Sequence, residues 1–209
     1  MDEASWVTCI KMRIGFDLDN TIVFYDKIFT KIGKSIKNFP ENLGYTKKSV
    51  ADFLRNSGRE SEWTKLQGLV YGPEMENAEP APNFLNVIKK LHKLGHSCFI
   101  ISHRTKKPSS GDNFDLHKAA NDWIDRFCRP YFDKVYFEET IEDKITRIDD
   151  LFLDVFIDDL EKVLLKIKSP YCEKILFSSQ FRSSNNFNSY DSWDKILSHI
   201  NYVQSSKNF

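Results

Sequence analysis

Short and nearly continuous apolar runs alternate along this chain with segments in which apolar residues recur every three or four positions. The runs lie at residues 12–16, 97–102, 134–137, 151–157 and 174–177. Apolar runs without alternation are typical of strands that are covered on both faces, as in parallel sheets. Helical spacing predicts helices at residues 83–94, 114–127, 160–168 and 190–202. The pattern therefore predicts an α/β fold built on a parallel sheet.

About 80 residues separate the first two predicted strands, which is far more than one crossover needs. Part of this interval has helical spacing of its own, and Thr46 and Ser61 stand where the N-caps of two helices are expected. We expect residues 25–71 to form a small α-helical insert, with the core made of residues 1–24 and 72–209. The segment 72–82, rich in Pro and Glu, is expected to act as a hinge back to the core.

Composition excludes several classes of protein. The 209 residues carry 30 Lys+Arg and 30 Asp+Glu, so no net charge favours a nucleic-acid polymer or a membrane surface. No apolar run approaches the roughly 20 residues of a membrane span, and the first residues lack the blocks of a signal peptide. The four cysteines are widely spaced, which favours reduced thiols over a disulfide framework or a zinc site. We expect a cytoplasmic protein, in which the polar stretch 178–188 is a flexible surface loop.

Two acidic pairs follow two of the predicted strands. Asp17 and Asp19 follow the first, and residues two apart on a strand face the same side. Asp158 and Asp159 follow the run at 151–157. Each pair alone has an ordinary explanation, as an acidic turn or as a helix cap. Together, at the carboxyl edge of one parallel sheet, they indicate a site for a hard cation such as Mg²⁺.

Polar and basic residues near these strands are candidates for holding a phosphate. Ser102 ends the second strand, and its hydroxyl and the following N–H groups suit a phosphate oxygen, although a lone serine there is usually a turn residue. Lys144 precedes the acidic strand and would neutralise phosphate, with Lys134 as a weaker competitor. In the basic loop that follows Ser102, Arg104 is a candidate to grip a second anionic group of a substrate. His103 is either a substrate contact or a loop hydrogen bonder.

These elements, in this order, resemble the motifs of the haloacid dehalogenase superfamily of phosphotransferases. The segment Asp17-Leu18-Asp19-Asn20-Thr21 matches the whole of its DxDxT motif, and Ser102, Lys144 and Ile157-Asp158-Asp159 resemble the other three. The resemblance implies a three-layer Rossmann-like parallel sheet core, with a small helical cap inserted after the first strand. It also implies Mg²⁺-dependent hydrolysis of a small phosphorylated metabolite, a nucleotide or a sugar phosphate.

The resemblance further implies roles for single residues. Asp17 would attack phosphorus and form an aspartyl-phosphate, and Asp19 would act as general acid and base. Mg²⁺ would be held by Asp17, by the backbone carbonyl of Asp19 and by a fourth-motif acid, with Asp158 preferred over Asp159. Thr21 and Ser102 would bind the phosphate group.

Within the superfamily, the residues favour some branches over others. The dehalogenase branch lacks an acid at the position of Asp19, so that chemistry is disfavoured. The pairs Asp143-Lys144 and Asp158-Asp159 look like the deoxyribonucleotidase branch, whereas Ser102-His103-Arg104-Thr105 departs from it. A non-catalytic member that binds a phosphorylated ligand or a protein, and a protein phosphatase, are the alternatives.

The helical insert carries an excess of positive charge. Between residues 26 and 71 there are nine Lys/Arg and five acids, which favours an anionic substrate unless the lysines simply solvate helix faces. Tyr25, Trp63 and Tyr71 could stack on a base or a sugar, or belong to the core of the insert.

Overall fold

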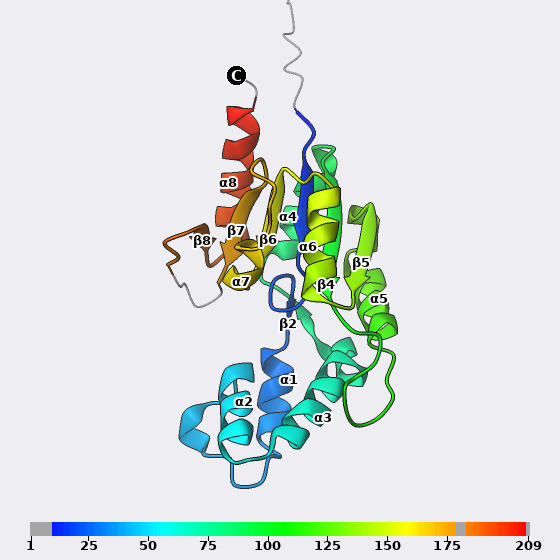
Figure 1. Ribbon diagram of the computed structural model, residues 1–209, viewed down its shortest axis with the longest axis vertical. Coiled ribbons are helices and arrows are strands. Elements are labelled where there is room, and N and C mark those ends of the chain that lie inside the picture. Colours follow the sequence, from blue (N-terminus) through cyan, green and yellow to red (C-terminus); the bar gives the residue numbers. More distant parts are fainter. Residues whose placement is uncertain (1–9, 179–182, 208–209) are drawn as a thin grey trace, which may run out of the picture.

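The computed structural model describes residues 10–178 and 183–207 and places a six-stranded, entirely parallel sheet at the centre of the molecule. The strand order is β5-β4-β1-β6-β7-β8 (Figure 1). The strands are β1 (Arg13–Phe16), β4 (Ser97–His103), β5 (Lys134–Glu138), β6 (Val155–Asp158), β7 (Glu173–Phe177) and β8 (Asn188–Tyr190). The predicted three-layer α/β fold class is confirmed.

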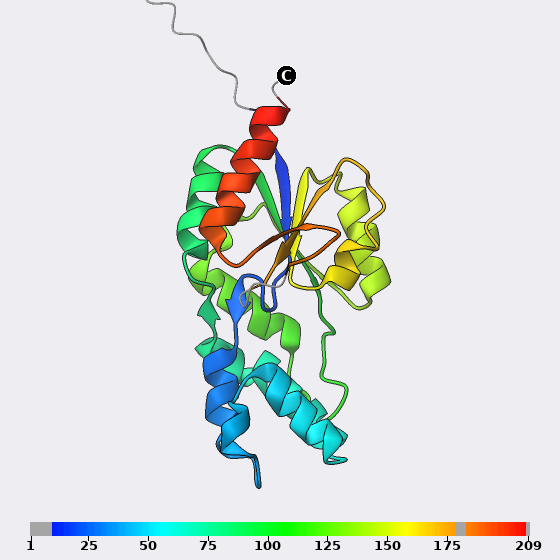
Figure 2. The same ribbon diagram turned by 90° about the vertical axis from the view of Figure 1, so that its left-hand side faces the viewer.

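Helices cover both faces of this sheet, as Figure 2 shows. One face is packed by α4 (Phe84–Lys93), α5 (Leu116–Phe127) and α8 (Trp193–Ser206), and the other by α6 (Ile141–Asp150) and α7 (Glu161–Leu164). Successive strand residues serve opposite faces, so that Ile100 packs with the first set and Ile101 with the second. Burial on both faces is why the strands have no polar alternation.

Three further helices lie together at one end of the molecule, away from the sheet (Figure 1). They are α1 (Asp26–Gly33), α2 (Lys47–Asn56) and α3 (Glu60–Tyr71), and we call them the helical unit. A 3₁₀ turn, η1 (Glu41–Leu43), lies between α1 and α2. The chain enters the unit through β2 (Val23–Phe24) and leaves it through a 3₁₀ turn, η2 (Pro73–Asn77), and β3 (Glu79–Pro80). Because β2 and β3 pair antiparallel, the two connections run side by side.

The remaining differences from the sequence predictions have local causes. The run at 151–157 becomes a strand only at Val155, because Leu151 caps α6 and Phe152 adopts a positive φ of 47°. The helix predicted at 160–168 ends at Leu164, and Tyr190, the first residue of the last predicted helix, is instead the last residue of β8. Thr46 caps α2 as predicted, whereas Ser61 lies within the first turn of α3, whose N-cap is Arg59.

Two other expectations concern cysteines and membrane spans. Cys98, Cys128 and Cys172 are buried and free, as predicted, while Cys9 lies outside the described residues. In the loop predicted at 178–188, residues 179–182 also lie outside them. None of the helices in the described part of the chain has the length and apolar character that crossing a membrane requires.

Candidate active site

The carboxyl ends of three adjacent strands bring the predicted polar residues together. β1 lies between β4 and β6, so Asp17, Ser102 and Asp158 arrive at the same edge of the sheet. The amide of Asp17 donates to the carbonyl of Ile157 at 2.9 Å, which continues the β1–β6 ladder into the site. Asn20, with a φ of 60°, then turns the chain toward β2. The position of Asp17 is thus set by the centre of the sheet.

Lys144 links the two acidic strand ends. Its Nζ donates to Asp17 Oδ1 at 2.5 Å and to Asp158 Oδ2 at 2.7 Å, and all three side chains are buried. It lies in the first turns of α6, which is capped by the side chain of Thr140. Burial lowers the pKa of Lys144, but Asp17 and Asp158 outweigh it and raise that pKa above its ordinary value. Both acids therefore favour the charged form of Lys144, and it is Lys144, not Lys134, that the structure places between them.

A group of three carboxylates has the geometry of a cation site. Oxygens of Asp17, Asp158 and Asp159 lie within 4.8 Å of one another. The pKa of Asp17 is raised to about 7: burial is the largest cause, the charges of Asp158 and Asp19 also raise it, and Lys144 acts in the opposite direction. The pKa of Asp159 is also well above its usual range, through burial and then through Asp17 and Asp158. The charges repel one another in this cluster, and a divalent cation with oxygen ligands would relieve that repulsion.

The two fourth-motif acids differ in what they already contact. Asp158 is fully buried, and its Oδ2 accepts from Lys144 while its Oδ1 accepts from the amide of Leu160 at 2.8 Å. Asp159 lines the cavity described below, and among the described residues it has neither a hydrogen bond nor an ion pair. The carboxylate of Asp159 is thus the more available of the two, in the reverse of the order expected from the sequence.

Asp19 stands apart from this group. Its Oδ1 accepts from Arg104 Nη2 at 2.5 Å and from the hydroxyl of Tyr25. Its carboxylate is not one of the three clustered oxygens, so a metal role for Asp19 would have to use another atom. The recorded contacts all use Oδ1, which leaves Oδ2 for the cavity.

The guanidinium of Arg104 is already held by protein groups, which conflicts with its predicted role of gripping a second anionic group of a substrate. Besides Asp19, its guanidinium donates to the carbonyls of Tyr71 at 3.0 Å and Leu116 at 3.3 Å, and it lies over the ring of Tyr71. Since the side chain is buried and its Nη atoms are held by protein groups, Arg104 orients Asp19 instead of gripping a second anion. His103 is exposed at the rim, where its Nε2 is 3.2 Å from the carbonyl of Glu139.

A cavity of about 360 Å³ lies over these residues, a size suited to a small ligand. It is lined from the core and from the helical unit. The core supplies Asp17, Asp19, Ser102, His103, Arg104, Lys144 and Asp159, and the helical unit supplies Lys47, Thr64, Gln67 and Tyr71. Thr21 is fully buried and does not line the cavity; its Oγ1 is 3.4 Å from Asp17 Oδ2, so it contacts Asp17 and not a ligand.

The sequence analysis named Tyr71 among the cavity-lining residues of the helical unit but did not single out Lys47, Thr64 or Gln67. Lys47 was counted only as one of nine basic residues, yet it alone among them lines the cavity. Its position in the first turn of α2 does not distinguish it, because the adjacent Lys48 opposes the helix dipole in the same way. Of the three aromatic candidates, Tyr71 lines the cavity, Tyr25 contacts Asp19, and Trp63 is buried and stacks on Phe29.

Comparisons with known proteins find similarity of structure only. No protein-family model matches the sequence, and no curated protein matches it. The structure is similar to a haloacid dehalogenase superfamily hydrolase from Ehrlichia chaffeensis, at 14% identity and a TM-score of 0.57, covering 93% of this chain and 98% of that one. It is also similar to a predicted phosphoglycolate phosphatase from Haemophilus somnus, at 16% identity and 0.57, covering 91% and 98%.

A dehalogenase with an intermediate complex is similar as well, at 11% identity and a TM-score of 0.63, covering 90% of this chain and 96% of the other. At these identities the similarity establishes the arrangement of elements and nothing finer. The chain has the fold of the haloacid dehalogenase-like hydrolases over almost its whole length.

Proposed function

We propose that this protein is a phosphomonoester hydrolase that uses Asp17 as its nucleophile and depends on Mg²⁺. The observation that carries the proposal is the Asp17–Lys144–Asp158 bridge beside Asp159, with Asp19 held separately two residues after Asp17. A structural role alone does not account for three carboxylates within 4.8 Å of one another, two of which, Asp17 and Asp159, line the cavity. The fold shared with known hydrolases supports the same reading.

The reaction has two steps at these side chains. An oxygen of Asp17 attacks phosphorus and forms an aspartyl-phosphate, while protonated Asp19 gives its proton to the oxygen of the departing alcohol. Asp19 then takes a proton from water as that water attacks the aspartyl-phosphate, which releases inorganic phosphate and restores Asp17. Arg104 and Tyr25 hold Asp19 in place for both proton transfers. Such assistance contributes about 10²–10⁴-fold to the rate.

The residues at the floor of the cavity fit Mg²⁺. Asp17 and Asp159 present carboxylate oxygens, and Asp158, in contact with Lys144, stands behind them. When bound, the cation would offset negative charge on the phosphoryl oxygens. Lys144 adds its own positive charge from the core side, and Ser102 at the end of β4 offers its hydroxyl to a phosphoryl oxygen.

We also propose that residues 25–71 act as a cap over the site, since Lys47, Thr64 and Tyr71 line the cavity from that side. A covered cavity of about 360 Å³ suits a small phosphorylated metabolite, a nucleotide or a sugar phosphate, better than a folded protein. The named phosphoglycolate phosphatase among the similar structures is consistent with this size class. Resemblance to the deoxyribonucleotidase branch rests on Asp143-Lys144 and Asp158-Asp159 alone.

Hydrolysis of p-nitrophenyl phosphate by the purified chain, with Mg²⁺ and with EDTA, tests the function. We expect turnover that requires the metal, a loss of at least about 10³-fold in Asp17→Asn, and a loss of about 10²–10⁴-fold in Asp19→Asn. Asp150→Asn, an exposed position on α6, is the control and should keep full activity. Mass spectrometry after acid quenching should find one phosphoryl group on the peptide that contains Asp17.

Two outcomes would overturn the proposal. Turnover that is absent with every divalent metal would leave a non-catalytic, phosphate-binding protein as the better account. Full activity in Asp17→Asn would remove the nucleophile. Halide release from 2-haloacids is measured alongside, because similar structures include a dehalogenase, and we expect none since Asp19 provides an acid that this chemistry does not use.

A further inference from the structure

The charges that line the cavity are paired with two exceptions. Lys144 contacts Asp17 and Asp158, and Arg104 contacts Asp19. Asp159 and Lys47 are left over: among the residues that the structure describes, neither has an ion-pair partner within 4.0 Å. Asp159 belongs to the carboxylate group that suits a cation. The ammonium of Lys47, at the same cavity, suits an anion.

Lys47 reaches the cavity from the helical unit and not from the core. It is the first residue of α2, and its Nζ lies 5.5 Å from the centroid of the Tyr71 ring on α3. The guanidinium carbon of Arg104 also lies over this ring, 5.4 Å from its centroid. Tyr71 is itself held edge-on by Tyr25, with ring centroids 5.1 Å apart. The aromatic pair therefore fixes Lys47 beside the Asp19–Arg104 pair.

The placement of Lys47 costs stability within its own helix. A cation in the first turn opposes the helix dipole, and α2 has no acidic residue there to offset it. Its neighbour Lys48 avoids the cavity and pairs with Asp52 on the outer face. Lys47 is half-buried, and no carboxylate of the described residues is in contact with it. Burial lowers its pKa, but Tyr71 first and then the more distant charges of Asp19 and Asp159 outweigh burial and raise that pKa, so the ammonium keeps its charge and lies at the cavity wall free of an ion pair with any described residue.

The geometry also separates Lys47 from the phosphoryl group that is transferred. That group must lie against Asp17, where Lys144 already supplies a positive charge from the core. Lys47 instead interacts electrostatically with Asp19 and Asp159, at the side of the cavity that the helical unit covers. Asp19 is the proposed acid for the departing alcohol, so a group near Asp19 and on the helical-unit side meets the leaving part of the substrate.

We propose that Lys47 selects substrates whose leaving group carries its own negative charge, a carboxylate or a second phosphate. This inference rests on the proposed hydrolase function. The ammonium of Lys47 binds the second anion while the phosphoryl group lies against Asp17. Tyr71 positions the ammonium through its ring, and the neutral walls supplied by Thr64 and Gln67 offer hydrogen bonds to the part of the substrate between the two charges.

Matched substrate pairs test the proposal. In each pair the two phosphomonoesters differ only by a carboxylate in place of a hydroxymethyl group: 3-phosphoglycerate against glycerol 3-phosphate, and phosphoglycolate against ethylene glycol monophosphate. We expect the native chain to prefer the carboxylate in at least one pair. In Lys47→Gln, the ratio of kcat/KM within that pair should fall by about 10- to 100-fold, the range for a hydrogen bond between charged groups. Lys47→Arg should keep most of the preference.

Lys48→Gln is the control, because it removes the same charge from the adjacent position on the outer face of α2. It should leave the ratio unchanged. Equal losses on both members of each pair in Lys47→Gln, or no loss at all, would overturn the proposal while p-nitrophenyl phosphate turnover still upheld the hydrolase function. If the native chain hydrolyses nothing, calorimetry of the same pairs with Mg²⁺ decides: Lys47→Gln must abolish a tighter binding of the carboxylate member, and otherwise the proposal fails.

Discussion

Asp17 is a buried carboxyl, and the groups around it have opposite effects on its pKa. Lys144 favours its charged form, whereas burial and the neighbouring carboxylates of Asp158 and Asp19 favour the protonated form, and the sum raises its pKa to about 7. A nucleophile must be ionised to attack phosphorus. On the proposed function, a cation bound by the cluster would shift this balance toward the charged form.

Without metal, this raised pKa has a consequence for stability. Between the unfolded pKa of 3.8 and the folded value of about 7, the folded chain holds a proton that the unfolded chain has lost, so stability falls as pH rises through this window. The variant Asp17→Asn has no carboxyl to titrate here, so its stability does not fall for this reason as pH rises. In EDTA, its free energy of unfolding relative to the native chain should therefore rise between pH 4 and pH 7, by roughly 1–4 kcal/mol.

Urea denaturation at several pH values measures this difference. The slope with pH is the informative quantity, because an asparagine also changes hydrogen bonding at every pH. Asp150→Asn, exposed on the same side of the fold as Lys144, should follow the native chain. Parallel curves for Asp17→Asn and the native chain would show that Asp17 is already ionised in the metal-free protein.

At the same scale, the sequence was informative about core residues and silent about those of the helical unit. Asp17, Ser102 and Asp158 end adjacent parallel strands, so their meeting follows from the fold class alone. Predicting that Lys144 joins them also required the order of the four motifs along the chain. Lys47 could not be placed in this way, since no pattern within α2 reveals how a separately packed helix is oriented over the sheet. The contacts that occupy Arg104 were hidden for the same reason.

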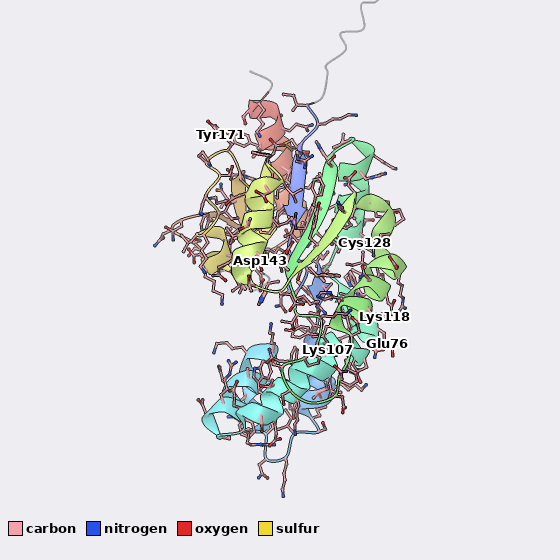
Figure 3. All side chains as sticks on the ribbon, turned by 45° about the vertical axis from the view of Figure 1, so that its right-hand side comes forward. Glu76, Lys107, Lys118, Cys128, Asp143 and Tyr171 are labelled. Atoms are coloured by element: carbon pink, nitrogen blue, oxygen red, sulfur yellow. The ribbon has the colours of Figure 1, made fainter. Side chains whose placement is uncertain are left out.

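The loop between β4 and α5 belongs to the core but packs against the helical unit. It follows β4, begins with Arg104 and crosses to α3, and Figure 3 labels Lys107 on it where it passes the unit. A Cβ on Gly68 of α3 would lie 3.0 Å from Cβ of Pro108 in this loop. A side chain at this position would therefore push the loop away from the helix unless Pro108 shifts.

Enlarging this position should loosen the loop. In Gly68→Val, the added isopropyl group meets Pro108, so we expect tryptic cleavage after Lys106 to accelerate several-fold and p-nitrophenyl phosphate turnover to fall. Leu69→Val is the matched control, because it places a β-branched residue one position along the same helix on an exposed side chain. If the two variants are cleaved at the same rate, the close packing of the loop is not what protects it.

Among the elements, the long ones were predictable and the short ones were not. β4 and α5 carry enough apolar periodicity to be placed within two residues. β8 has three residues and is visible only through its pairing with β7, and α7 ends after four residues although Ile167 continues its buried face. In elements of three or four residues, the conformation is decided by the elements packed against them and not by the apolar pattern of the segment itself.

For the whole molecule, the carboxylate cluster predicts that metal stabilises the fold. A ligand that binds only the folded state at about 100 times its Kd contributes roughly 2.7 kcal/mol. For a chain of this size that corresponds to a rise in Tm of roughly 5–10 °C. We expect Mg²⁺ to produce such a rise in the native chain and little of it in Asp159→Asn, measured by differential scanning fluorimetry.

The same measurement separates this prediction from a general salt effect. Asp159→Asn should be more stable than the native chain in EDTA, since it removes one of three mutually repelling carboxylates. Asp150→Asn should keep the full response to Mg²⁺. A Tm that rises equally in all three proteins would mean that the ion acts elsewhere.

The antiparallel pairing of β2 with β3 has a consequence for how such a protein changes over evolutionary time. Because the chain enters and leaves the helical unit at neighbouring points, the interval between Phe24 and Glu79 can change without altering the path of the sheet, provided that Tyr25, which holds Asp19, is kept. On the proposed function, the carboxylates that perform the chemistry lie outside that interval, and Lys47 and Tyr71, which select the substrate, lie inside it. Selection for a new substrate can therefore act on one contiguous stretch of the gene while the reaction is inherited unchanged.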